Sequence, residues 1–203
     1  QLKNVIFPLS NYKKDDVKQI AKESDFRSYS KKESMGICFI GNKKFKDFIK
    51  KYISNKPGKI YNDKNEVLGE HNGMFYTTIG QREGIGIGGI KNAKNLPWYV
   101  YKKDVDSNSL YACQGNQNKL LFSDLIYLDD INIITNDIND ILGLNLSCQI
   151  RHLGEKYPCN VIRTDNNKLL VKTKSPVRAV APGQSLVLYD KNLCMGGGII
   201  SNA

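Results

Sequence analysis

Short alternations of apolar and polar residues dominate the chain from residue 59 onward. Apolar positions there recur with the period of two that is typical of half-buried strands, between turn signals rich in Gly, Pro, Asn and Asp. The first group of predicted strands spans 59–61, 66–70, 74–79, 98–103 and 109–113. The second group spans 125–134, 146–152, 158–164, 168–173, 185–189 and 193–200. Six short strands at this spacing predict a small antiparallel barrel.

Two segments before residue 59 show the period of an amphipathic helix. Residues 13–24 place Val17, Ile20 and Ala21 on one face, and residues 45–53 place aromatic residues and Ile on one face and Lys on the other. Residues 2–8 are predicted to form a short strand that runs into a turn, and the apolar run 36–41 a strand or an extended loop. A strand and a helix cannot form a core by themselves, so this region predicts the end of an α/β domain.

The predicted fold is therefore mainly β with short helices. We expect a remnant of an α/β domain over 1–40, a small central α+β domain over 41–118 and an antiparallel β-barrel domain over 119–203. The sequence begins at Gln1 rather than Met, which suggests a piece or a processed product of a longer protein.

Composition narrows the class of partner. The chain has 203 residues, 40% of them apolar, and 30 Lys and Arg against 20 Asp and Glu give a net charge of +10. Such an excess favours a polyanion, which could be RNA, DNA or an acidic membrane face, although a bias towards Lys and Asn in the genome would also produce it. No apolar run approaches the roughly 18 residues of a membrane helix. We therefore expect no membrane partner and a cytoplasmic location, or an organelle of bacterial descent.

The chemistry-bearing residues are scattered. Five Cys residues without a CxxC pair or zinc spacing indicate a reducing compartment and no metal site. The glycine-rich stretch 84–89 is followed by Asn and Pro rather than by a helix, so we read it as a β loop and not as a dinucleotide fingerprint. A lone His71 is more typical of a hydrogen-bonded structural residue than of a catalytic one.

Five residues remain as candidates for a functional site. Cys38 lies between Gly36 and Gly41 and close to two Lys residues, which would suit a reactive thiol, although a buried structural cysteine fits equally simply. Arg151 and His152, placed on a predicted strand, could hold a phosphate and stack on a base. The turn 178–185 carries Arg178 and Gln184, which suit phosphate and base-edge contacts, or are the flanks of an ordinary hairpin.

Several strings then match one family in order. They are KKESMGICFIG (31–41), PGKI (57–60), LGEH (68–71), TIGQREGIGIGG (78–89), PWYV (97–100), APGQS (181–185) and CMGGGII (194–200). Together they closely resemble the tRNA-specific 2-thiouridylase family, over about residues 5–200. The long middle block is the most specific of them.

The resemblance implies an enzyme that replaces the C2 oxygen of the wobble uridine of tRNA with sulfur. In this family an N-terminal ATP-pyrophosphatase domain, with ATP and magnesium, adenylates that oxygen, and two cysteines take part in sulfur delivery. The cysteine of the GICF motif carries the persulfide and corresponds to Cys38. An Arg-Tyr pair on the barrel and the Gln of the PGQ turn contact tRNA, and Arg151-His152 and Gln184 match them.

The chain differs from the family pattern in two ways, and each changes what we expect of it. His152 stands where the family has Tyr, which keeps a stacking ring and loses a phenolic hydrogen bond. The ATP-binding string SGGxDS is absent from the sequence, so we expect no cofactor in this chain, and no thiolation by it alone. A sulfur carrier or a cysteine desulfurase would load Cys38. The alternative is a non-catalytic, basic RNA-binding module in which Cys38 is inert.

Overall fold

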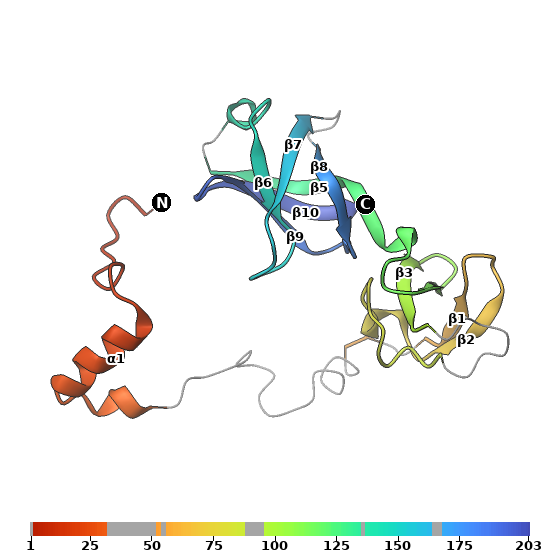
Figure 1. Ribbon diagram of the computed structural model, residues 1–203, viewed down its shortest axis with the longest axis horizontal. Coiled ribbons are helices and arrows are strands. Elements are labelled where there is room, and N and C mark those ends of the chain that lie inside the picture. Colours follow the sequence, from red (N-terminus) through yellow and green to blue (C-terminus); the bar gives the residue numbers. More distant parts are fainter. Residues whose placement is uncertain (1, 32–51, 54–55, 88–95, 135–136, 164–167) are drawn as a thin grey trace. The chain divides into compact units, whose positions relative to one another are not determined.

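The computed structural model describes the chain except for residues 1, 32–51, 54–55, 88–95, 135–136 and 164–167 (Figure 1). The chain divides into two compact units, 1–52 and 53–203, which are described separately below. The predicted strand or loop at 36–41 and nearly all of the predicted helix at 45–53 lie outside the described residues, as does Cys38.

The described part of the first unit is helical. Helix α1 (Lys14–Glu23) confirms the helix predicted over 13–24, with Asp15 and Asp16 in its first turn and Lys22 in its last, where they complement the helix dipole. A short 3-10 helix, η1 (Arg27–Ser30), follows. The strand predicted over 2–8 is wrong: the amide of Val5 donates to the carbonyl of Leu2 in a turn. No neighbouring strand pairs with this segment in the described part of the unit.

The second unit begins with a four-stranded sheet. Its strands β1 (Gly58–Tyr61), β2 (Val67–His71), β3 (Trp98–Asp104) and β4 (Ser109–Gln114) lie in the order β2-β1-β4-β3. Strand β1 is parallel to β4, and the other pairs are antiparallel. The strand predicted over 74–79 is wrong, because Met74–Tyr76 form the 3-10 helix η2. Gly73, with φ of 134°, turns the chain there, and buried Met74 fixes the helix to the core of the sheet.

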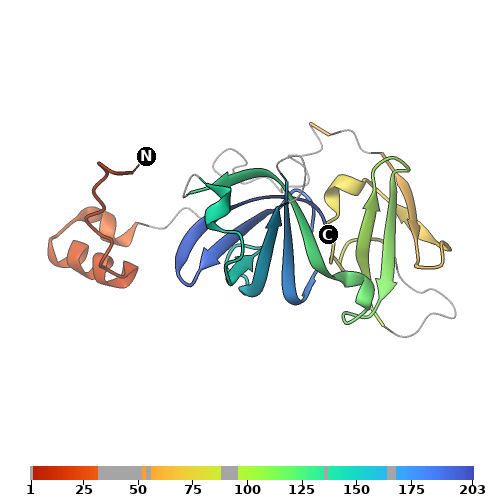
Figure 2. The same ribbon diagram turned by 90° about the horizontal axis from the view of Figure 1, so that it is seen from above.

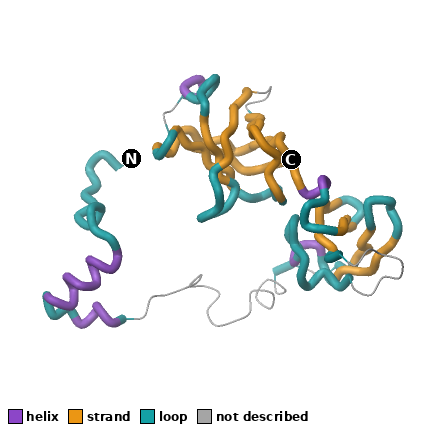
Figure 3. The backbone as a smooth tube through the Cα atoms, viewed as in Figure 1, coloured by secondary structure: helices purple, strands orange, loops and turns teal. Residues whose placement is uncertain are grey.

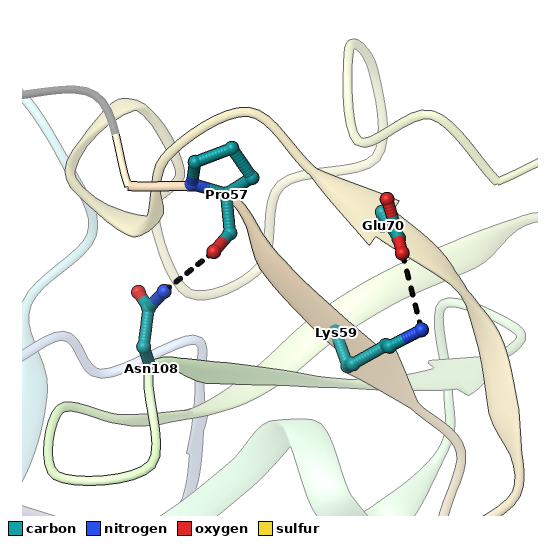
Figure 4. A network of polar contacts seen from close by, with 4 residues as sticks. All are labelled: Pro57, Lys59, Glu70 and Asn108. Atoms are coloured by element: carbon teal, nitrogen blue, oxygen red, sulfur yellow. Dashed lines mark hydrogen bonds and ion pairs between the residues drawn. The ribbon is translucent and has the colours of Figure 1, made fainter.

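A polar network joins the ends of these strands (Figure 4). The Asn108 side-chain amide donates to the carbonyl of Pro57 at 2.8 Å, which ties the β3–β4 turn to the start of β1. Buried His71 accepts from the amide of Gly73 at Nδ1, so its Nε2 donates to the carbonyl of Asn108 at 3.1 Å. The structural role predicted for His71 is therefore confirmed. The ion pair between Lys59 and Glu70 is exposed, so it adds little stability.

The rest of the second unit is a closed barrel of six antiparallel strands, as predicted (Figures 2 and 3). The strands pair in the order β10-β5-β8-β7-β6-β9. They are β5 (Phe122–Ile133), β6 (Leu146–Gln149), β7 (Tyr157–Arg163), β8 (Leu169–Arg178), β9 (Ser185–Asp190) and β10 (Leu193–Asn202). Alternate residues point inward, for example Leu169, Val171 and Thr173 of β8, and form a continuous core.

Gly197 allows the barrel to close. It lies in β10 between β5 and β9, where it pairs with Asn132 and Val187. A Cβ atom on Gly197 would collide with the carbonyl oxygen of Leu186. Any side chain there would hold the two strands apart, so the glycine is required by close backbone approach.

The sheet and the barrel meet at Ala179, directly after β8. The Ala179 amide donates to the carbonyl of Leu121 at 2.7 Å, and its φ of 55° is a left-handed conformation that is uncommon for alanine. The Ala179 methyl group lies where a Cβ atom on Gly80 would be. Next to it, Arg178 donates from Nε to the carbonyl of Asn116 at 3.2 Å and lies 5.1 Å from the ring centroid of Tyr99.

The substitution Gly80→Ala should destabilise the chain by about 2–4 kcal/mol, because it adds left-handed strain at a φ of 84° to a collision with Ala179. Urea unfolding measures this. Gly69→Ala is the matched control: the nearest atom to its new Cβ is 3.9 Å away, so stability should change little. Equal effects of the two substitutions would contradict a tight junction at Ala179.

Candidate nucleic-acid interface

Arg151 and His152 lie in a turn and not on the strand predicted over 146–152. Strand β6 ends at Gln149, and the turn of residues 151–154 is closed by a 2.9 Å hydrogen bond from the amide of Gly154 to the carbonyl of Arg151. The side-chain amide of Gln149 donates to the carbonyl of Gly154 at 2.6 Å and braces the turn. Leu153, with φ of 59°, reverses the chain. The prediction of a longer strand was wrong because the chain bends directly after Gln149 and turns through Leu153.

This turn displays its side chains to solvent. Arg151 and His152 are both exposed. One guanidinium nitrogen of Arg151 donates to the carbonyl of Ala179 at 3.0 Å, which orients the side chain. Because a guanidinium group has five N–H donors, the others can still contact an anion. The turn therefore presents an oriented cation next to an exposed imidazole ring.

Gln184 ends a second turn, which is tied to β10. Its amide donates to the carbonyl of Ala181 at 3.3 Å, and its carbonyl accepts from the amide of Ile200 at 2.8 Å. Gly183 has a φ of 84°, which this turn requires. The side chain of Gln184 is half-buried, and its Oε1 atom is buried without a hydrogen-bond partner among the residues that the structure describes.

Both turns meet the segment of residues 179–184 that joins β8 to β9. Arg151 is anchored to the start of this segment at Ala179, and Gln184 is its last residue. The structure thus ties Arg151 and Gln184, two of the four described candidates, to one connection. Arg178 differs from them: its contacts with Asn116 and Tyr99 give it a structural role at the junction.

The described cysteines are mostly buried. Cys113, Cys148 and Cys159 are buried in the sheet and the barrel, whereas Cys194 is half-exposed. Burial raises the pKa of the Cys113 thiol to about 11. A hydrogen bond with Cys159, together with burial, raises the pKa of the Cys148 thiol. The thiols of Cys113 and Cys148 are therefore protonated near neutral pH, as expected of small structural residues, whereas the hydrogen bond with Cys148 lowers the pKa of the Cys159 thiol.

The described residues contain no helix long and apolar enough to cross a membrane. No group of three His, Cys, Asp or Glu side chains in these same parts of the chain is arranged to hold a metal ion.

Profiles of known families match three consecutive parts of the chain. Residues 1–42 match a profile described as tRNA methyl transferase HUP domain, and residues 46–114 one described as tRNA methyl transferase PRC-barrel domain. Residues 123–200 match an aminomethyltransferase beta-barrel domain profile. The fold and these profiles together place the chain in the class of tRNA-modifying proteins.

Curated relatives identify the family more closely. The tRNA-specific 2-thiouridylase MnmA of Buchnera aphidicola is 44% identical over 208 residues, which cover all of this chain and 55% of that protein. MnmA of Francisella philomiragia is 40% identical over 98% of the chain and 55% of its own length. MnmA of Pseudomonas fluorescens Pf-5 is 42% identical over all of the chain and 53% of its own length.

The chain belongs to the tRNA-specific 2-thiouridylase family, as the sequence motifs predicted. These names take precedence over the methyl transferase wording of the profiles, because the relatives match along the whole chain whereas each profile matches one part. The chain spans about half the length of the curated relatives it matches. The domain boundaries and the roles of Cys38, Arg151, His152 and Gln184 stay predictions.

Thiol labelling tests the burial of the cysteines. In a Cys38→Ser chain at pH 8, Cys194 should react first with a disulfide reagent, and Cys113, Cys148 and Cys159 should react only on unfolding.

The stability of the chain should also depend on the Cys113 thiol at alkaline pH. An unfolded thiol ionises at about pH 8.5. Since the pKa of native Cys113 is about 11, the unfolded chain binds fewer protons between these values, and Cys113 should lower stability as pH rises through that window.

As a control, all four thiols should be labelled once the chain is unfolded in 6 M guanidinium chloride. Reaction of Cys113 in the native chain at the rate of Cys194 would contradict this account.

Proposed function

We propose that this chain is the tRNA-holding and sulfur-delivering part of an ATP-dependent tRNA-uridine 2-sulfurtransferase. The observation that carries this proposal is the 40–44% identity, along essentially the whole chain, to proteins named tRNA-specific 2-thiouridylase. The net charge of +10 supports a polyanionic substrate. The complete activity belongs to a longer protein, since these relatives are nearly twice as long.

Cys38 is the proposed persulfide carrier. The family's GICF motif contains this cysteine, which Gly36 and Gly41 flank in the sequence. The terminal sulfur of the Cys38 persulfide attacks C2 of the adenylated uridine, and AMP leaves. A second thiol then attacks the inner sulfur of Cys38 and breaks its S–S bond to the uridine. The thiolated uridine is released, and a disulfide remains between the two cysteines, which a thiol reductant must reduce before the next turnover. A sulfur carrier or a cysteine desulfurase supplies the persulfide.

ATP and magnesium act elsewhere in the longer protein. The family's ATP-binding string is absent from residues 1–203, and no described cluster of residues fits a metal ion. We therefore assign activation of the uridine to another domain, and expect no thiolation by the chain alone.

Arg151, His152 and Gln184 are the proposed tRNA contacts. Arg151 is exposed and oriented by Ala179, which suits a phosphate. His152 is exposed next to it and can stack on a base or a ribose. The Oε1 atom of Gln184 has no hydrogen-bond donor among the described residues, so it can accept a hydrogen bond from the edge of a base.

The alternative function is a basic RNA-binding module without chemistry. The described barrel and its exposed cation would serve such a module equally well, and the two proposals differ only in the role of Cys38. Reactivity of this cysteine towards a persulfide donor separates them.

The substitution Arg151→Ala should weaken binding of a tRNA transcript by about threefold to tenfold and lower the slope of log affinity against log salt by about 1. Arg151→Lys should keep the charge and most of the affinity. Filter binding between 50 and 200 mM salt measures both. Arg27→Ala, an exposed arginine in the first unit, is the matched control. An unchanged affinity for Arg151→Ala would remove Arg151 from the interface.

A complementation experiment tests the enzyme. The chain is mixed with the separately produced ATP-pyrophosphatase domain of the same protein, tRNA, ATP and a persulfide donor, and thiolated uridine is measured by mass spectrometry. We expect thiolation with the wild-type chain and a loss of at least 100-fold, taken as roughly 3 kcal/mol of barrier, with Cys38→Ser. Cys194→Ser is the control. Thiolation that persists with Cys38→Ser would leave the binding module as the better account.

A further inference from the structure

A cleft of about 900 Å³ runs along the edge strand β3, where the sheet meets the barrel. Residues of η2 and of β3 form one side, and residues 120–123, 180–184 and 201–203 form the other. This volume is at the upper end of the range for ligand sites and would hold two or three nucleotides, but not a duplex. Gln184 is the one residue of the cleft that the sequence singled out.

The charged side chains among the described residues that line the cleft are all lysines. Lys102 and Lys103 are part of the lining, and none of the described lining residues is Asp or Glu. The remaining polar groups are hydroxyls and amides, such as those of Thr78, Ser123 and Asn202. Lysine, amide and hydroxyl side chains together form a surface that favours a phosphate-bearing ligand.

Lys103 has no anion to balance its charge. It is half-buried, and burial lowers the pKa of its ammonium group. The adjacent carboxylate of Asp104 accepts hydrogen bonds from the backbone amides of Asp106 and Ser107 within its own turn, and no ion pair with Lys103 occurs among the described residues. A phosphate group entering the cleft would supply the counter-charge.

Phe75 gives the cleft an exposed aromatic ring. It lies in η2 between Met74, which is 4% exposed, and Tyr76, and 62% of Phe75 is itself exposed. Because Met74 is anchored in the core of the sheet, η2 holds Phe75 at the rim of the cleft. An exposed ring on a fixed support is a stacking platform for an unpaired base.

Gln184 adds a group that can recognise a base. Its Oε1 atom is buried in the wall of the cleft and has no donor among the described residues. Unsatisfied buried acceptors are rare in proteins. An N–H group of a base edge would provide the donor once the amide turns towards it.

We propose that this cleft binds single-stranded nucleotides of the tRNA, with Phe75 stacking on a base and Lys103 paired with a phosphate. This inference rests on the proposed function and adds Phe75 and Lys103 to the interface. An apolar peptide would also contact Phe75 and nearby Leu120. It would leave Lys103 without a counter-charge, so RNA is the better fit.

The test compares two fluorescent RNA hairpins with identical stems. One has a seven-nucleotide loop, and the other has the same loop with abasic sugars. Phe75→Ala should weaken binding of the first hairpin about tenfold and of the second less than twofold, because stacking needs a base. Lys103→Gln should weaken both about threefold to tenfold and lower the salt slope by about 1. Fluorescence anisotropy measures the affinities.

Matched controls come from elsewhere in the chain. Phe26→Ala removes a phenyl ring that is 61% exposed in the first unit, and Lys64→Gln removes an exposed lysine of the β1–β2 turn. Both should bind like wild type. If wild type binds neither hairpin, the proposed function fails. If wild type binds and Phe75→Ala and Lys103→Gln stay within twofold of it, only the cleft proposal fails.

Photocrosslinking checks the same contact without a substitution. A 5-bromouridine in the loop should crosslink to the peptide that contains Phe75 in the wild-type chain. Crosslinks confined to peptides outside the cleft would overturn the proposal, whatever the variants do.

Discussion

The contacts of Ala179 are the constraint on which the second unit depends. Its amide donates a hydrogen bond to the carbonyl of Leu121, and its carbonyl accepts one from the guanidinium group of Arg151. Its methyl group occupies space that a side chain on Gly80 would need. A left-handed alanine costs about 1–2 kcal/mol, so it persists only where surrounding contacts over-determine it. Here those contacts come from the sheet, the barrel and the connection between them. One residue thereby fixes the exit of β8 and the junction of the two β structures.

The proposed interface follows from this constraint. The carbonyl of Ala179 holds the Arg151 side chain, and the segment that ends at Gln184 begins at the same residue. The latter segment forms one wall of the cleft, and β3, held through Val100 by residues 80–81, forms the opposite wall. Cation, amide and aromatic ring are thus supported by backbone hydrogen bonds rather than by long loops. Such support positions binding groups before the ligand arrives.

The sequence predicted the barrel because its strands have one buried and one exposed face, which leaves a period of two in β8 and β9. It failed at η2, where alternation suggested a strand. The apolar Met74 is an anchor, and the conformation of Gly73 starts a helical turn instead. It also failed at Arg151, since a left-handed Leu153 has no clear signal in the sequence.

The cleft had no local signal either. Phe75, Lys103 and Gln184 are far apart in the sequence and meet only because Ala179 and Gly80 join the sheet to the barrel. The motifs, by contrast, identified the family, because a run such as TIGQREGIGIGG is specific beyond the elements it forms.

The central claim is that this chain holds tRNA specifically. The most direct test is a competition measurement: labelled tRNA transcript bound to the 203-residue chain at 150 mM salt, challenged with unlabelled tRNA or with duplex DNA of equal phosphate content. We predict saturable binding of the labelled tRNA. Unlabelled tRNA should displace it, whereas a tenfold excess of DNA should not. Equal displacement by both competitors would show that charge alone binds RNA, and would contradict the account.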